Sequence, residues 1–377
     1  MLFTFWLRNW KRLAPAARRR TPTSAHQQFR FRPRLEACED RCLPSGLPYP
    51  TAATVSQLIA DINYADQTGG AFTINLQPSA TFDVKSVNNT TDGANGLPVV
   101  GGTKAVDLTI LGNGDTIERA ISTSSGHGKK QDNSPAFRLF EVAAGASLTL
   151  DHVTLKQGSA AGTGGAIYNL GTLTISNGIF SNNSGGDIYN AGGTATVSYS
   201  TLPSISNNGG TVTVSHCTLP GGGVTNQSGT MTLSDSAVSG GRGIYNAGTL
   251  MVNTSTISNN SATYGGGIYN AGTLTVSNTT ISGNEASLGG GIYNHGTATL
   301  SGCTITGNYA YRIVGCTSQE QQSGGIFNDG TLTIKDSSQV TRNPYSELGD
   351  DVYNLGMVYL DTTSTIGILD GNPPILI

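Results

Sequence analysis

The sequence predicts an all-β protein folded as a single parallel β-helix, in which every coil supplies three short strands. The first observation is an internal repeat, clearest in GGGIYNAGTLTVSNTTISGNEASL at 265–288 and in its neighbours at 243–264 and 289–311. The second is that GIYN, TLTVS and TIS alternate inward and outward residues, as strands with one buried face do. The third is the period of about 20 residues, which suits a solenoid and not a propeller blade. Weaker copies begin at 164, 185, 207, 224, 324 and 351.

The composition agrees with that fold and excludes several others. The chain has 377 residues, of which 51 are Gly and only 12% are charged. A disordered chain would carry more charge, a collagen would place Gly at every third position, and a coiled coil would be rich in Ala, Glu, Lys and Leu. The chain contains no run of about 18 apolar residues, so the sequence predicts no membrane-spanning helix. We expect the Gly and Asn of each unit to supply the positive φ that tight bends require.

Three regions follow each other along the chain. Residues 1–50 form a basic leader that we expect to be largely disordered, and their first 45 residues hold ten Lys/Arg against three Asp/Glu. Because aromatic residues are not interleaved with these cations, we interpret them as a targeting or tethering segment and expect no nucleic-acid binding. Residues 51–136 are expected to form an N-terminal cap and the first irregular coils. Residues 137–377 are expected to form the regular coils with a C-terminal cap.

The elements before the repeats can be assigned in order. Residues 54–67 predict one amphipathic helix, with Thr54 or Ser56 as its N-cap and Leu58 in its apolar stripe. Such a helix can cover the open end of a solenoid. The remaining predictions are strands at 72–76, 81–84 and 106–111, a flexible polar loop at 119–135, a first regular coil at 137–155 and a cap at 367–377.

Inward residues of successive units are predicted to stack in three columns. Cys217 and Cys303 fall where other units have Gly, Ser or Thr, so we interpret both as small packing residues. They lie about 19 Å apart at the spacing of about 4.8 Å between strands, too far for a disulfide, whereas a Cys303–Cys316 bridge is left open. The columns are Leu173, Leu250, Leu274 and Leu332; then Ile175, Val197, Val214, Leu233, Val252, Val276, Leu300 and Ile334; then Phe180, Leu202, Leu219, Val238, Ile257, Ile281 and Ile305.

The string GGGIYNxGTLTVSNxTISGN resembles the right-handed parallel β-helix repeat proteins of bacterial surfaces. The GGAI and xxN elements of polymorphic outer-membrane-protein repeats are similar to GGAIYN at 164–169 and TISGN at 280–284. The resemblance covers about residues 137–360 and implies a right-handed solenoid with three sheets. The same pectin-lyase-like superfamily contains pectate lyases and polygalacturonases, so the resemblance leaves enzymes and non-enzymes open.

A second resemblance lies in the leader. The segment RPRLEACEDRCLPS at 32–45 is similar to the LExLEDRxxPS segment found near the N-terminus of many surface or secreted proteins of planctomycete-type bacteria. It implies export, with a secreted or cell-surface location at the outer envelope. The matching positions are Leu35, Glu36, Glu39, Asp40, Arg41, Pro44 and Ser45.

Two more columns follow from the IYN motif. The Asn resembles the asparagine ladders of the β-helix family, whose amides hydrogen-bond from coil to coil, and we interpret it as structural. The aromatic column is either a platform for sugar rings or a stack that stabilises neighbouring coils, and we favour stabilisation. The Asn column is Asn169, Asn190, Asn246, Asn270, Asn294, Asn328 and Asn354, with Asn208 and Asn226 in the weaker units. The aromatic column is Tyr168, Tyr189, Tyr245, Tyr269, Tyr293 and Tyr353, with Phe327.

The regular coils offer little for catalysis. Residues 157–311 contain one basic side chain, Arg242, and three acidic ones on different faces, so we assign no catalytic residue. Near the end of the chain, four carboxylates on two coils could hold calcium weakly, although a solvated turn is the favoured interpretation. These weak candidates are Asp350, Asp351, Asp329 and Asp336.

Two smaller groups of polar side chains are also interpreted as non-catalytic. His127, Lys129 and Lys130, near Asp132 and Arg138, are interpreted as part of a flexible loop. The neighbouring pair Asp151 and His152 is expected to point to opposite faces of a strand and to form no dyad.

Outward Thr pairs suggest a third class, because regular Thr arrays on flat solenoid faces occur in ice-binding proteins. We expect this array to be interrupted at Met251, at Ala298 and in the irregular units at 185–240. Thr also suits strands in general, so the pairs are not specific.

The sequence therefore predicts an exported or cell-surface β-helix with a structural, adhesive or ligand-display role and no catalysis. The alternative is a polysaccharide lyase or glycoside hydrolase of the same fold. A cluster of acidic and basic side chains on one face would favour the enzyme. No cofactor is expected, the chain is expected to be a monomer, and polysaccharides or surface proteins are its expected partners.

Overall fold

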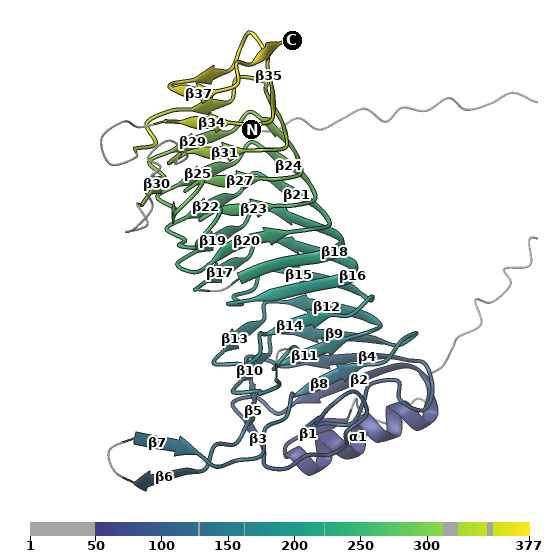
Figure 1. Ribbon diagram of the computed structural model, residues 1–377. Helices are drawn as coiled ribbons and strands as arrows, with labels where there is room; N and C mark the ends of the chain where they lie inside the picture. The colour runs from purple at the N-terminus through teal and green to yellow at the C-terminus, as the bar shows by residue number, and fades with distance from the viewer. Residues whose placement is uncertain (1–49, 127–128, 162, 222, 312–322, 345–349) are drawn as a thin grey trace, which may run out of the picture. The chain divides into compact units, whose positions relative to one another are not determined.

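The computed structural model describes residues 50–126, 129–161, 163–221, 223–311, 323–344 and 350–377. The chain divides into two units, Met1–Leu47 and Pro48–Ile377, and all the described residues belong to the second. Figure 1 shows that unit as a stack of coils between α1 (Val55–Thr68) and β37 (Leu369–Gly371). The leader predicted at 1–50 lies outside the described residues, apart from Pro50.

Most of the described regular coils contain three short strands, as the repeat predicts; the coil at 185–204 has only an isolated bridge at Thr201 in the third position. One coil consists of β23 (Ile268–Asn270), β24 (Thr273–Ser277) and β25 (Thr280–Ser282). Every strand pairs in parallel with the corresponding strand of the next coil, so that Ile268 lies opposite Ile292. The predicted all-β fold of stacked parallel sheets, a parallel β-helix, is therefore confirmed.

The first and second strands of the coils form one sheet of 23 described strands, because β16 (Ile205–Ser215) and β18 (Gly223–Ser234) run through both positions. The third strands form sheets of four and seven described strands. The other first strands are β8 (Phe140–Val142), β11 (Ile167–Asn169), β14 (Ile188–Asn190), β20 (Gly243–Asn246), β27 (Ile292–Asn294), β31 (Ile326–Asn328) and β34 (Val352–Asn354). The other second strands are β2 (Gly70–Leu76), β4 (Val106–Leu111), β9 (Ser147–Asp151), β12 (Thr172–Ser176), β15 (Thr194–Ser198), β21 (Thr249–Asn253), β28 (Thr297–Ser301), β32 (Thr331–Lys335), β35 (Met357–Leu360) and β38 (Ile375–Leu376). The other third strands are β3 (Thr81–Val84), β5 (Thr116–Arg119), β10 (Thr154–Lys156), β13 (Ile179–Ser181), β17 (Thr218–Pro220), β19 (Ala237–Ser239), β22 (Thr256–Ser258), β29 (Thr304–Thr306), β33 (Gln339–Val340) and β36 (Thr365–Ile366).

The predicted N-terminal helix is α1. Thr54 is its N-cap, and the Thr54 hydroxyl accepts a hydrogen bond from the Gln57 backbone N–H while the Gln57 side chain accepts one from the Ala53 N–H. This reciprocal capping satisfies two amides that a helix start leaves unpaired. Leu58 and Ile62 are fully buried among the first coils, so the helix covers core side chains at that end.

Two segments form strands where the sequence predicted a flexible loop and a C-terminal cap. The segment predicted as a flexible loop at 119–135 forms an antiparallel hairpin of β6 (Thr123–Gly126) and β7 (Lys129–Asp132). Buried Arg119 anchors its base, because the guanidinium donates to the Asp132 carboxylate at 2.5 Å and to the carbonyl oxygen of Gln157 at 2.8 Å. Within 367–377, β37 and β38 continue the parallel sheets as a last coil.

The three predicted inward columns are confirmed, since every residue assigned to them is buried. The register adds members that the sequence prediction omitted: Ala195, Val212 and Met231 continue the first column from Leu173 to Leu250. Cys217 and Cys303 are buried and free, as expected of small packing residues. Cys316 lies outside the described residues, so its pairing stays a prediction.

The bends obtain their geometry only partly in the way that the sequence predicts: Gly and Asn supply positive φ at many bends, as at Asn278 and Gly283, but not at every bend. Gly272, in an Asn-x-Gly bend, has no positive φ; instead, a Cβ there would overlap the carbonyl oxygen of Gly248 on the preceding coil. Glycine is needed at this bend because two backbones approach closely. Positive φ occurs one bend later, directly after the second strand of each coil, at His152, Asn177, Tyr199, His216, Asp235, Thr254, Asn278, Gly302 and Asp336.

The outward Thr residues form more regular rows than expected. The register carries both rows through the irregular units at 185–240, and Ala298 is a buried inward residue that interrupts neither row. Met251 does interrupt one row, as predicted. The rows are Thr172, Thr194, Thr211, Thr230, Thr249, Thr273, Thr297 and Thr331, and Thr149, Thr174, Thr196, Thr213, Thr232, Thr275, Thr299 and Thr333.

Candidate ligand-binding surface

The predicted asparagine ladder is present, with one member that differs from the prediction. Each side-chain amide donates to the Oδ1 atom of the Asn on the next coil, at distances from 2.6 to 3.0 Å. Asn207, and not Asn208, occupies the ladder in β16; Asn208 is exposed and donates to the Tyr189 hydroxyl instead. A register shift between Asn207 and Asn208 explains this difference. The complete ladder is Asn169, Asn190, Asn207, Asn226, Asn246, Asn270, Asn294, Asn328 and Asn354.

A second asparagine ladder, which the sequence analysis missed, follows the third strands. Asn260, Asn284 and Asn308 donate in turn to the next Asn at 2.9 Å, and the row ends at Asn343. The Asn343 amide then donates to Asp351 Oδ1 at 2.9 Å. The signal was the xxN element, which places Asn at a fixed distance after each third strand.

A hydroxyl column joins the second and third strands. Ser or Thr at this bend accepts a hydrogen bond from the backbone N–H of the preceding coil, as Ser338 does from the Cys303 N–H at 3.0 Å. Cys303 itself contacts the carbonyl oxygen of Val276 through Sγ at 3.3 Å. Burial raises the pKa of the Cys303 thiol, which therefore stays protonated at neutral pH and serves packing.

The four acidic candidates each have their own surroundings. Asp351 is buried and accepts hydrogen bonds from Asn343 and from the Ile368 N–H, so it ends the second ladder. Asp329 lies 2.9 Å from His295 Nδ1. Among the described residues, no group of three or more His, Cys, Asp or Glu could hold a metal ion.

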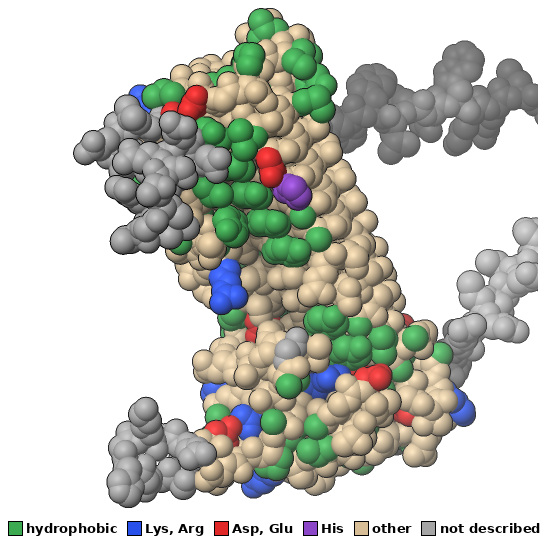
Figure 2. All heavy atoms as spheres, in the orientation of Figure 1, with side chains coloured by type: hydrophobic (Ala, Val, Ile, Leu, Met, Phe, Trp, Pro, Cys, Tyr) green, Lys and Arg blue, Asp and Glu red, His purple; other side chains and the backbone are tan. Residues whose placement is uncertain are grey.

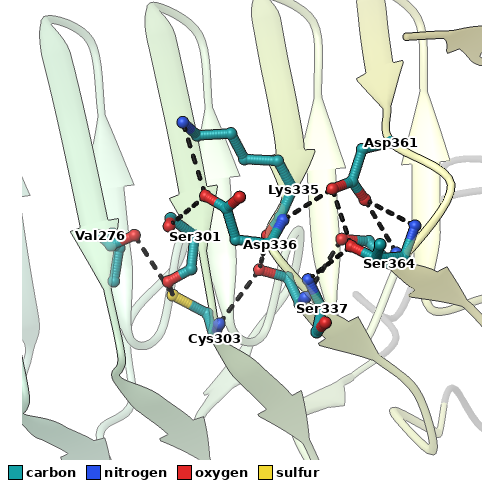
Figure 3. Close-up of polar contacts among 10 residues, drawn as sticks. Val276, Ser301, Cys303, Lys335, Asp336, Ser337, Asp361 and Ser364 are labelled. Atoms are coloured by element: carbon teal, nitrogen blue, oxygen red, sulfur yellow. Dashed lines mark hydrogen bonds and ion pairs between the residues drawn. The ribbon is translucent and has the colours of Figure 1, made fainter.

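The other two carboxylates also differ from one another. Asp336 accepts from the Ser301 hydroxyl at 2.6 Å and lies 3.5 Å from Lys335 Nζ (Figure 3). Burial raises the pKa of Asp350, and the neighbouring charges of Asp370 and Asp351 raise it further.

The smaller polar groups are placed as follows. Asp151 and His152 do contact each other, with Oδ2 and Nδ1 3.0 Å apart, so the prediction that they point to opposite faces was wrong. The reason is the positive φ of His152, which ends the alternation of the strand. Arg138 is buried with its guanidinium 4.5 Å from the centre of the Tyr168 ring. The side chains of 127–130 lie outside the described residues.

The aromatic column is divided into two stacks. Tyr168 and Tyr189 stack at 5.7 Å between ring centres. Ser206 and Thr225 then occupy the next two coils, and a second stack begins at Tyr245. It continues through Tyr269, Tyr293, Phe327 and Tyr353 with ring centres 5.0 to 5.6 Å apart and planes within 19°.

A groove lies where the second stack begins, because the turns change length there. The turn before β20 spans three residues, 240–242, whereas the turn before β23 spans nine, 259–267. Residues 261–264 of the longer turn line one side of the groove, and Tyr311 supports this turn by donating a hydrogen bond to the carbonyl oxygen of Ala262 at 3.2 Å. The result is a groove of about 810 Å³.

Aromatic rings and one cation line this groove. The rings belong to Tyr245, Tyr264, Tyr269 and Tyr311, and the charged group is Arg242. Tyr245 is 42% exposed and Tyr264 is 46% exposed. Figure 2 shows a band of hydrophobic side chains along the upper coils, with a basic side chain at its lower end. Tyr245 and Tyr269 belong to the predicted aromatic column, whereas Tyr264, Tyr311 and the groove itself were not predicted, because they depend on how the turns fold.

The chain matches no known protein family, no curated protein and no solved structure. Among the described residues, no helix is both long enough and apolar enough to cross a membrane.

Proposed function

We propose that this chain is an exported, right-handed parallel β-helix with three sheets that displays a ligand-binding surface and performs no catalysis. Three strands per coil support the three-sheet geometry, and the strong preference of parallel crossovers for the right hand supports the handedness. The repeat resemblance to polymorphic outer-membrane proteins and the leader segment at 32–45 support the surface location.

The observation that carries the display role is the groove at the start of the second aromatic stack, where Tyr245 and Tyr264 are exposed. Tyr245 has a second stacked ring on one side only, because Thr225 lies opposite it on the other side, so the groove rings form a rigid apolar platform on which a sugar ring can stack without ordering a loop first. The polar side chains beneath the platform are already paired within the ladders, so they serve the scaffold. The two asparagine ladders and the hydroxyl column thus explain how a chain with few charged residues can keep the coils beneath the aromatic platform rigid.

A binding and turnover screen tests this proposal. The full chain is incubated with insoluble neutral and acidic polysaccharides, with and without calcium, and both pelleted protein and released sugar are measured. We expect at least one polysaccharide to retain the chain, and retention to fall at least tenfold for Tyr269→Leu. Release of new reducing or unsaturated ends would support a lyase or hydrolase instead, and absence of any retention would refute the display role.

The surface location has a separate test. A tagged full chain is expressed in a planctomycete host, and external protease is added to intact cells. Loss of the tagged chain from intact cells is expected, whereas protection until lysis would contradict the proposed location.

A further inference from the structure

The groove at the start of the second stack borders a gap in the aromatic column, where Ser206 and Thr225 stand in place of rings. Tyr245 stacks on Tyr269 on one side, with ring centres 5.3 Å apart. On its other side the register places Thr225, a much smaller side chain. Every coil of the second stack places an aromatic ring here, so the coil of Thr225 leaves room for a ring that the chain does not supply.

The groove adds one positive charge beside this vacant position. Arg242 precedes Tyr245 by three residues, is exposed, and forms no ion pair with another described residue. An unpaired guanidinium at a groove offers its planar set of N–H donors to a carboxylate, which it binds in two parallel hydrogen bonds. The charge therefore selects an anionic substituent on whatever ring stacks on Tyr245.

Small polar groups complete the lining. Ser261 and Thr263 come from the long turn that forms one wall, and Thr225 comes from the coil beneath. Hydroxyl groups at these positions suit a ring with many hydroxyl substituents, because each can donate and accept. A nucleotide fits less well, since nucleic-acid grooves follow the backbone with several cations and residues 46–377 hold eleven Lys/Arg against twenty-one Asp/Glu.

We propose that this groove captures a sugar ring that carries a carboxylate, with the ring stacked on Tyr245 and the carboxylate on Arg242. The inference rests on the proposed display function and specifies its ligand. One acidic ring is held where the turn before β20 is short and the turn before β23 is long.

Calorimetry on the full chain tests it with two matched probes, a β-1,4-linked glucuronate tetramer and cellotetraose, which differ only in the carboxylate. We expect the glucuronate tetramer to bind at least tenfold more tightly at low salt, and this preference to shrink as salt is added. Arg242→Gln should abolish the preference while leaving cellotetraose binding unchanged. Tyr245→Leu should weaken both probes at least tenfold.

The controls separate this site from general effects. Lys85→Gln removes an exposed cation from the first coils, and Tyr199→Leu removes an exposed ring outside the aromatic column; neither should change either affinity. Circular dichroism and the melting temperature confirm that each variant is folded.

Equal binding of both probes, or an unchanged preference in Arg242→Gln, would overturn the inference and leave the display function standing. Binding of neither probe overturns it too, and the pelleting screen then decides separately on the display function. Tighter binding of adenosine monophosphate than of the glucuronate would assign the groove to nucleotides.

Discussion

Asn246 shows how one residue of the asparagine ladder connects neighbouring coils. Its Nδ2 atom donates to Asn270 Oδ1 at 2.8 Å and to the Thr273 carbonyl oxygen at 3.0 Å, while its Oδ1 accepts from Asn226. The side chain is fully buried, so none of these bonds can be replaced by water at the surface. A ladder position thus joins three coils through one amide.

Replacing Asn246 by Leu should therefore destabilise the chain by about 3 kcal/mol, because the buried amide groups of Asn226 and Asn270 each lose a ladder hydrogen bond that water cannot replace. Urea unfolding followed by circular dichroism measures the effect. The matched control is Asn208→Ala, an exposed position one residue outside the same ladder, whose change should stay within about 0.5 kcal/mol. Similar midpoints for both variants would contradict the role of the ladder.

Asp132 provides a test at low pH. The hydrogen bond from Arg119, followed by that from the Ser134 backbone N–H, lowers the pKa of Asp132 to about 2. Because the folded pKa lies below the unfolded value of about 3.9, the carboxylate contributes stability above that value and loses it as the pH falls towards 2. The melting temperatures of the chain and of Asp132→Asn should differ at pH 6 and converge near pH 2. A constant difference across this range would show that Arg119 does not hold the charge.

Among the elements, α1 has the clearest separable role. Leu58 is buried among the first coils, whereas Asn63 lies on the exposed face of the same helix. Leu58→Ala should cost about 3 kcal/mol, since it leaves a cavity under the helix, and Asn63→Ala should cost almost nothing. Proteolysis at the first coils is the accompanying measurement, because a loosened helix exposes that end before the rest unfolds. Equal protease sensitivity in both variants would mean that α1 covers nothing essential.

Strands and turns differed in how well the sequence predicted them. Strands such as β24 could be predicted because the period-two pattern repeats in many units and a one-residue slip would bury Thr in place of Leu. Asn207 could not be separated from Asn208, since both precede glycine and only the register distinguishes them. The groove was invisible because turn length in sequence does not say how a turn projects. The contact between Asp151 and His152 could not be predicted, because it depends on a positive φ at His152 that the residue type does not indicate.

At the scale of the whole unit, coils are interchangeable parts. Asn246, Asn270 and Asn294 are each 24 residues apart, so removal of 265–288 brings β21 against β28 in the same register. Stability in such an array is a sum of coil and interface contributions. The shortened chain should fold with unchanged β content and a lower urea midpoint. Removal of 265–276, half a coil, should abolish folding by circular dichroism; a folded half-coil deletion would show that register does not govern assembly.

The main ladder also has a direction. Every amide turns its N–H groups towards the next coil and its oxygen towards the previous one. One reversed amide would set oxygen against oxygen on one side and hydrogen against hydrogen on the other, so each coil imposes its orientation on its neighbour, as in a row of aligned dipoles. The two ends are therefore unlike: Asn169 Oδ1 has no donor among the described residues, whereas Asn354 donates to the Asn372 carbonyl oxygen. Although the ladder is built from one repeated unit, its two ends differ, so a further coil can extend it in only one orientation.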